Sequence, residues 1–446
     1  MAAWRAALAG HEVTVVERSN RVGGMAASHS VAGLRVDLGS HRLHPSTPPA
    51  ILDALRGLLG DDLQERPRNG RVRLGDRWIA FPLRATDLVT RTPRRFAAGA
   101  LRDSVLAPTR RPRADTFAEV VRAGLGPTVA DAFYAPYIRK IWGVDPTELS
   151  GELARRRVSA GGPAAIARRV LRARRPEGRT FLYPRRGFGQ LAECIADAAV
   201  GAGATIRCDV DVERLTLRVD GGTVRLAGGE SIDADRVWST APLPELATRT
   251  DPAPDPPVLE AARRLAHRAV VLAYLVLDRP RWTAFDAHYF PGEDVPMARL
   301  SEPRNYRGSS EDPPDRTVLC AELPCDVGDA TWTATESELG DRVAPALARL
   351  GLPPAMPVHT EVVRLPRVYP VYRPGFEWDL SALDLWAADQ PALLTFGRQG
   401  LFVPDNSHHA LEMGWAAADA LRSDGSFDQA AWTSSRTRFR SFIVED

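Results

Sequence analysis

The chain is 446 residues long, with 44% hydrophobic and 26% charged residues, a composition typical of a folded protein with more than one core. The formal net charge is only +2 and no nucleic-acid-binding motif is present, so we expect no nucleic-acid partner. The longest strongly apolar run, residues 269–277, is far shorter than the ~20 residues of a membrane-spanning helix, and no signal-peptide pattern opens the chain, so we expect a cytoplasmic protein without an integral membrane segment.

The four cysteines are Cys194, Cys208, Cys320 and Cys325. They form no C-x-x-C pair and have no histidine partner nearby, so we expect neither a disulfide framework nor a metal site. Unpaired thiols of this kind usually behave as small buried hydrophobes.

The chain opens with a small-residue helix that leads into an apolar strand at residues 11–16 and then Glu17. In a Rossmann unit, an acidic residue at the tip of such a strand holds the ribose of a dinucleotide. The glycine fingerprint G-x-G-x-x-G lies roughly 20 residues before that acidic residue, and counting back from Glu17 reaches Met1. We therefore expect the crossover helix to be present and the first strand, with its phosphate-binding loop, to be missing from this sequence.

The middle of the chain alternates between strand and helix patterns. Residues 28–60 predict a strand, a loop with several histidines, and a helix that begins after Pro48-Pro49 and ends near Gly60. Residues 61–180 look mainly helical and polar. A loop, a helix and a strand follow at 183–215, then a hairpin with a turn at Asp220-Gly221-Gly222, and strand patterns continue through residues 265–325.

The last strong signal is a capped helix near the C-terminus. Residues 405–407 (Asp-Asn-Ser) are favourable N-caps, and small residues at 410, 414, 417 and 418 allow a backbone or a ring to approach the helix closely. The helix dipole and the free N–H groups favour negative charge, such as the pyrimidine side of a reduced flavin. An ordinary helix packed on a sheet is the alternative.

Arginine is unevenly distributed along the chain. Residues 151–186 hold eleven arginines and two acids, which suggests a basic surface for an anionic substrate, a carrier or an acidic lipid face and leaves peripheral membrane contact open. The alternative is that arginine is simply the usual surface cation here, because the whole chain contains one lysine, Lys140.

Several motifs occur in a specific order. Glu17, RVGGMAAS at 21–28 and DLGSH at 37–41 form the pattern E…R-x-G-G-x-x-x-S…D-x-G-x-H. This pattern resembles the signature of the FAD-dependent amine oxidase, protoporphyrinogen oxidase and phytoene desaturase superfamily. Residues 133–158, 181–199 and 396–421 are similar to motifs of its protoporphyrinogen-oxidase-like branch. HRLH at 41–44 and RVYPVY at 367–372 are also similar to UDP-galactopyranose mutases of the same superfamily.

The resemblance implies an α/β fold in which a Rossmann-like FAD-binding domain, three-layered around a parallel sheet, is interrupted by a mixed-sheet substrate domain and a helical subdomain. We predict a discontinuous FAD-binding domain at residues 1–60, 181–245 and 390–425. Residues 61–180 would form a mainly helical substrate or cap region, and 246–389 a mixed α+β substrate domain. Residues 426–446 would form a C-terminal helical tail.

The resemblance also implies FAD as the cofactor and assigns contacts to it residue by residue. Glycines suit such places because a Cβ would collide with the cofactor or forbid the backbone angles. The expected contacts are Glu17 at the adenosine ribose; Arg21, Gly23 and Gly24 along the pyrophosphate and ribityl chain; Gly39, Ser40 and His41 beside the isoalloxazine ring; Val212 at adenine; and Gly397, Arg398, His409 and Ala410 at the other end of the flavin.

The candidate catalytic residues are Lys140 and His41. A lysine can change its protonation state where an arginine cannot; a salt-bridged or capping lysine is the alternative. The candidate substrate residues are Tyr137, Trp142, Tyr289, Arg299, Tyr369 and Tyr372; for the aromatic ones, plain core packing is the alternative.

Three functions are compatible with these motifs. The first is an FAD-dependent oxidoreductase that takes a hydride from a C–C or C–N bond of a small, mostly apolar substrate. The second is a non-redox flavoenzyme like UDP-galactopyranose mutase, and the third is a truncated, non-catalytic binding protein. The motifs leave the oligomeric state open.

Overall fold

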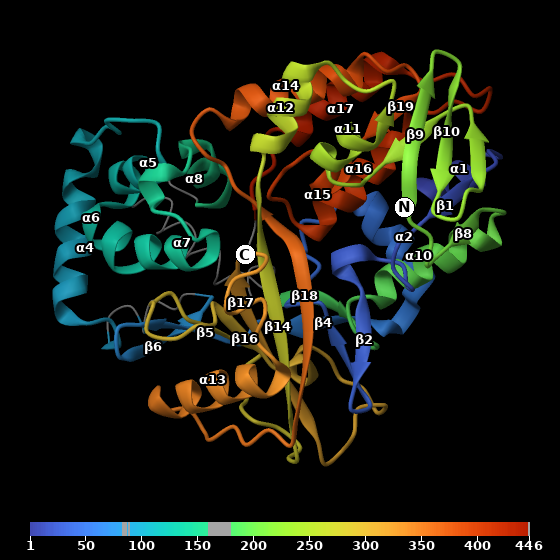
Figure 1. Cartoon of the computed structure of the whole chain (residues 1–446). Coiled ribbons are helices and arrows are strands. Elements are labelled where there is room, and N and C mark those ends of the chain that lie inside the picture. The colour runs from blue at the N-terminus through green and yellow to red at the C-terminus, as the bar shows by residue number, and fades with distance from the viewer. Residues whose placement is uncertain (83–86, 88–89, 159–179, 445–446) are drawn as a thin grey trace.

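The computed structural model describes residues 1–82, 87, 90–158 and 180–444. Figure 1 shows a long sheet through the middle of the molecule, a group of helices on one side of it, and short parallel strands with their own helices on the other. Parallel and mixed sheets covered by helices confirm the predicted α/β fold class.

The first elements match the sequence pattern. Helix α1 (Ala2–Leu8) leads to strand β1 (Thr14–Val16), which Glu17 directly follows. Strand β1 pairs in parallel with β8 (Thr205–Arg207), and β8 follows helix α10 (Gln190–Gly201). Ala7 of α1 and Ala199 of α10 pack in one small apolar cluster beside these strands.

A second parallel pair lies nearby. Strand β12 (Val237–Ser239) pairs with β19 (Leu393–Thr395), which leads into α15 (Gly397–Gly400) and α16 (Ser407–Asp419). Within the described ranges, the β1–β8 pair and the β12–β19 pair are not hydrogen-bonded to each other. Val15 of β1 and Trp238 of β12 line the same cavity, so this cavity reaches both parallel pairs.

A four-stranded sheet follows α10 and β8 in the chain. Its order is β11 (Ser231–Ala234), β10 (Gly221–Leu226), β9 (Val212–Arg218) and β13 (Thr250–Asp251). Gly221 already pairs with Arg218, so the hairpin turn is Val219-Asp220, slightly earlier than predicted. Helices α11 (Leu243–Arg249), α12 (Pro256–Arg264) and α14 (Phe376–Ala388) pack beside it.

The segment after β1 builds a small hairpin and a helix. Strands β2 (Ser28–Val31) and β3 (Leu34–Asp37) pair antiparallel. Helix α2 (Pro49–Leu59) ends at Gly60 as predicted and begins at Pro49, one residue earlier than predicted. Strand β4 (Leu63–Pro67) then pairs with β7 (Thr180–Pro184), far along the chain.

The central sheet has seven strands. Their order is β18 (His359–Pro370), β14 (His267–Leu277), β17 (Thr317–Cys325), β16 (Arg299–Ser301), β15 (Ala287–Tyr289), β5 (Gly70–Leu74) and β6 (Arg77–Phe81). All neighbours are antiparallel except β15 and β5.

The apolar run 269–277 is explained by its place in this sheet. Successive side chains of a strand point to opposite faces. Val271 and Leu275 of β14 pack with helix α13 (Glu336–Arg349) on one face, and Val270 and Leu272 pack with β2 and β3 on the other. Because both faces are covered, the strand is continuously hydrophobic.

A group of helices lies on the other side of the molecule. They are α4 (Arg94–Leu106), α5 (Phe117–Leu125), α6 (Pro127–Val129), α7 (Ala135–Trp142) and α8 (Gly151–Arg157), with a π-helical turn at Ala130–Tyr134. A final helix, α17 (Gln429–Phe439), packs on α16. No helix in the described ranges is long and apolar enough to cross a membrane.

The prediction of mainly helical structure from residue 61 onward is wrong for its first part. Residues 63–67, 70–74 and 77–81 are strands. Gly70, Val72 and Leu74 are buried in alternation, and β5 and β6 complete one edge of the seven-stranded sheet. Most of the arginine-rich stretch 151–186 falls on residues 159–179, which lie outside the described residues.

Candidate functional site

A single large cavity connects the parts of the fold described above. Its volume is about 3530 Å³, well above the roughly 300–1,000 Å³ of an ordinary small-molecule pocket. Its wall runs from Glu17 at the end of β1 to Tyr369 on β18 and Tyr137 on α7. The cavity therefore has room for a dinucleotide and a second, smaller molecule.

The end of β1 carries the acid and the two glycines for which the sequence predicted ribose and pyrophosphate contacts, and all three line the cavity. The Glu17 carboxylate accepts hydrogen bonds from the backbone N–H of Ser19 at 2.8 Å and from its hydroxyl at 2.7 Å. Gly23 has φ +104°, and a Cβ there would meet the Cβ of Ala192 on α10 at 3.0 Å. Gly24 has φ +53°, and a Cβ there would meet nothing within 4 Å. Since Gly24 lines the cavity, a side chain at this position would project into open space.

The turn after β3, at residues 38–41, also lines the cavity. Gly39 has φ +99°, and a Cβ there would lie 3.5 Å from a carboxylate oxygen of Glu322; the backbone N–H of Ser40 donates to this oxygen at 2.9 Å. His41 Nε2 lies 3.0 Å from the carbonyl of Leu38, and the ring stacks on Phe188. Burial lowers the pKa of His41, so this ring lines the cavity in its neutral form and donates to the main chain.

Two partly buried arginines beside this turn are matched by acids. Arg299 Nε and Nη2 each donate to the Glu322 carboxylate at 2.8 Å. Arg42 pairs with Asp286 at 3.1 Å and donates to the hydroxyls of Tyr289 and Tyr306 at 3.3 and 3.4 Å. Each of these cations therefore has its own counter-charge inside the protein.

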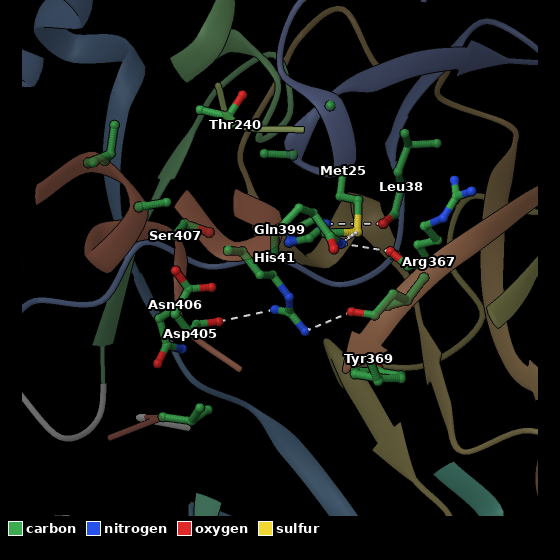
Figure 2. A pocket seen from close by; sticks show the side chains of 18 of the residues that line it. Met25, Leu38, His41, Thr240, Arg367, Tyr369, Gln399, Asp405, Asn406 and Ser407 are labelled. Carbon is green, nitrogen blue, oxygen red and sulfur yellow. Dashed lines mark hydrogen bonds between the residues drawn. The ribbon is translucent and has the colours of Figure 1, made fainter. Parts of the chain in front are cut away.

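The residues at the N-terminus of α16 line a third part of the cavity. Arg398 donates to the carbonyls of Asp405 at 3.1 Å and Val368 at 3.0 Å. Figure 2 shows Asp405, Asn406 and Ser407 together at the start of this helix, with Tyr369 on the other side of the view. Asp405 is 7% exposed, and its Oδ2 has no hydrogen-bond partner among the described residues. Burial raises the pKa of Asp405 to about 7, against the opposing effect of Arg398.

The cavity brings together most of the residues that the sequence predicted. Those in its wall are Glu17, Arg21, Gly23, Gly24, Gly39, Ser40, His41, Val212, Arg398 and Ala410, together with Tyr137, Trp142, Tyr289, Arg299 and Tyr369.

Lys140 lies outside the cavity wall. Its Nζ donates to the carbonyls of Phe290 at 2.7 Å and Met297 at 3.1 Å. These bonds tie α7 to the segment that joins β15 and β16. This placement fits a structural lysine, which was the alternative in the sequence, rather than a catalytic one.

Three further predicted residues lie outside the cavity wall. Tyr372 donates to the carbonyl of Phe402 at 2.7 Å and stacks on Phe376 in the core. The ring of His409 stacks on Phe442 and accepts the N–H of Asn406 at 3.2 Å, which caps α16. Gly397 is buried at the start of α15. Tyr372 thus packs in the core and His409 caps α16.

Glu322 and Asp286 were missed from the sequence, and Arg42 and Asp405 stood in quoted segments without a predicted role at the site. Glu322 had a readable signal, because it is the only acid in the buried strand TVLCAELPC and a buried charge needs a partner. The partners themselves could not be found, since Asp286 and Arg42 meet only in the folded chain.

These features fit a flavin dinucleotide. Glu17 follows the parallel strand β1, and a side chain at Gly24 would project into the cavity. At the N-terminus of α16, the buried Asp405 has one carboxylate oxygen without a hydrogen-bond partner among the described residues. Fold and site together define a flavin-dependent enzyme of the Rossmann type.

The chain belongs to the flavin-containing amine oxidoreductase family, whose model matches residues 1–422. This confirms the predicted superfamily and makes the protein an FAD-dependent oxidoreductase. No curated protein matches the chain in a sequence comparison.

Solved structures show the same fold at low identity. A reduced UDP-galactopyranose mutase is 20% identical with a TM-score of 0.80, over 100% of this chain and 97% of that one. A candidate protoporphyrinogen oxidase from Exiguobacterium is 18% identical, with a TM-score of 0.67 over 89% and 91% of the two chains. Cyclohexylamine oxidase from Brevibacterium oxydans is 17% identical, with a TM-score of 0.64 over 98% and 97%.

Proposed function

We propose that this enzyme oxidises a C–C or C–N bond of a small, mostly apolar molecule. The observation that carries the proposal is the continuity of the cavity from Glu17, at the cofactor end, to the aromatic wall at Tyr137 and Tyr369. A substrate lying against that wall is in the same continuous cavity as Glu17 and Gly24.

The chain's own residues act mainly by positioning. Bound FAD supplies the hydride acceptor. The apolar side chains Phe117, Ile138 and Ala298 line the cavity and exclude water from the substrate. The Arg299–Glu322 pair fixes the N–H of Ser40, so the turn beside the flavin site is held rigid before substrate arrives.

The test is anaerobic reduction of the FAD-loaded protein. The purified chain is mixed with FAD, free cofactor is removed, and the visible flavin bands are followed while small amines and apolar acids or alcohols are added. We expect retained FAD and bleaching by at least one compound with an oxidisable C–C or C–N bond. Retained FAD with no bleaching by any class of compound contradicts the proposal.

A second candidate is a non-redox reaction like that of UDP-galactopyranose mutase. It is supported by the similar segments HRLH at 41–44 and RVYPVY at 367–372. In that case a UDP-sugar raises the unfolding temperature of the FAD-loaded protein. No shift with any nucleotide sugar counts against the mutase.

A further inference from the structure

Arg157 lies over two aromatic rings that line the cavity, those of Trp142 and Tyr369. Its guanidinium carbon lies 5.0 Å from the ring centre of Trp142 and 5.7 Å from that of Tyr369, and these two ring centres are 5.6 Å apart. Trp142 is 3% exposed, and its indole N–H donates to the carbonyl of Pro370 at 3.1 Å. The ring is therefore fixed, and the arginine that lies over it is held at the cavity wall.

Aromatic faces of this kind are the places where proteins bind ammonium groups. Here the guanidinium of Arg157 already lies over the faces of Trp142 and Tyr369. Arg398 lies 5.9 Å from the same Tyr369 ring, and the positive charge of Arg157 opposes that of Arg398. A protonated amine at this wall would thus meet two like charges.

Arg157 also differs from its neighbours in its charge balance. The structure records no ion pair for Arg157 among the described residues, whereas Arg155 and Arg156 on the same helix pair with Asp115 and Glu152. The acids nearest to the other cavity arginines are already engaged, with Glu322 bound to Arg299 and Asp286 to Arg42. The Arg157 guanidinium therefore brings a positive charge to the cavity that these acids do not balance.

We infer that the substrate carries an oxyanion group, bound by Arg157, and that the site selects against protonated amines. A guanidinium presents several N–H donors in one plane and suits a carboxylate or a phosphate. Arg157 is then a specificity-determining residue, and the apolar part of the substrate lies along Tyr137 and Ile138, which line the same cavity. This inference rests on the proposed function, since it assigns the substrate class of that same site.

The test uses three probes with one apolar part and different charged ends: 3-phenylpropionate, 2-phenylethyl phosphate and 2-phenylethylamine. Their binding to the FAD-loaded protein is measured by titration calorimetry. We expect at least one anion to bind and the amine to bind more weakly. Arg157→Gln weakens the anion by roughly tenfold, the size of one hydrogen bond to a charged group, and Arg157→Lys recovers part of that loss. The control is Arg139→Gln, an exposed arginine paired with Asp145 outside the cavity wall, which leaves binding unchanged.

The outcomes separate the two proposals. Tighter binding of the amine, equal anion binding by the wild type and Arg157→Gln, or binding of none of the probes overturns the inference. The preference between carboxylate and phosphate identifies the kind of oxyanion. FAD content and unfolding temperature are recorded for each variant, so a folding defect is recognised. Anion binding through Arg157 without flavin reduction by any substrate contradicts the redox proposal and leaves the anion site intact.

Discussion

The guanidinium of Arg299 and the carboxylate of Glu322 form two parallel hydrogen bonds, each 2.8 Å long. The Glu322 side chain is 6% exposed and that of Arg299 is 23% exposed, so the protein rather than water neutralises both charges. Glu322 also accepts the N–H of Ser40. The pair thus joins β16 and β17 to the turn that lines the flavin side of the cavity.

Glu322→Gln should lower the free energy of unfolding by about 2 kcal/mol, between the values for exposed and for fully buried pairs, because it leaves the partly buried Arg299 without its counter-charge. The matched control is Glu148→Gln, which breaks an exposed pair with Arg373 and should change the value by less than about 1 kcal/mol. Urea denaturation measures both. Equal, small effects of the two substitutions would mean that the Arg299 charge is not held by Glu322.

Gly24→Val should abolish retention of FAD while the protein stays folded, because the new side chain occupies open space in the cofactor groove. The control is Gly75→Val at the exposed tip of the β5–β6 hairpin. Gly75 has a similar φ of +62° and also has no neighbour within 4 Å, so it carries similar backbone strain. The flavin absorbance of the two purified variants measures how much FAD each one retains. Normal flavin content in Gly24→Val would refute the assignment of this loop.

Lys140→Met should leave the rate of flavin reduction unchanged, because the Lys140 ammonium binds backbone carbonyls outside the cavity wall. Burial lowers the pKa of Lys140 from 10.5 to about 8. Between these two pH values the unfolded chain holds a proton that the folded protein has released. The stability of the wild type relative to the variant therefore rises with pH over this window, by up to about 1.4 kcal/mol per pH unit.

Urea denaturation at pH 7.5 and 9.5, beside stopped-flow reduction of the flavin, measures both effects of Lys140→Met. A slower reduction in the variant would return Lys140 to the catalytic site. A stability difference that does not depend on pH would contradict the lowered pKa.

Asp405 should make the protein less stable as the pH rises from about 4 to 7. Burial raises its folded-state pKa from 3.8 to about 7, so in this window the folded protein holds a proton that the unfolded chain has lost. The loss is at most about 1.4 kcal/mol per pH unit, and Asp405→Asn should remove it. Asp424→Asn is the control, because hydrogen bonds from Ser426 lower the pKa of Asp424 and it titrates below this window. Urea denaturation across this pH range measures the effect. If the free energy of unfolding changes with pH equally in the wild type and Asp405→Asn, Asp405 stays ionised in the folded protein.

Local signals in the sequence were sufficient for many elements of the fold. Pro49 at the start of α2, followed by buried Ile51, Leu55 and Leu59, marks one helix from spacing alone. The strand that ends at Glu17 and the hairpin near Asp220 are likewise short-range features. Such features depend on neighbouring residues, so a single segment carries the information for them.

The sequence by itself determined the family, the cofactor and the order of the motifs around the groove. Only the tertiary structure decided that Lys140 faces two carbonyls and that residues 70–81 are strands, since their sheet partner β15 lies more than 200 residues later, pairing Arg71 with His288. It also decided that Arg157, on α8, lies over Trp142 and Tyr369 at the cavity wall. Contacts of this kind join segments far apart in the chain, and packing and charge matching select them only when the whole fold has formed.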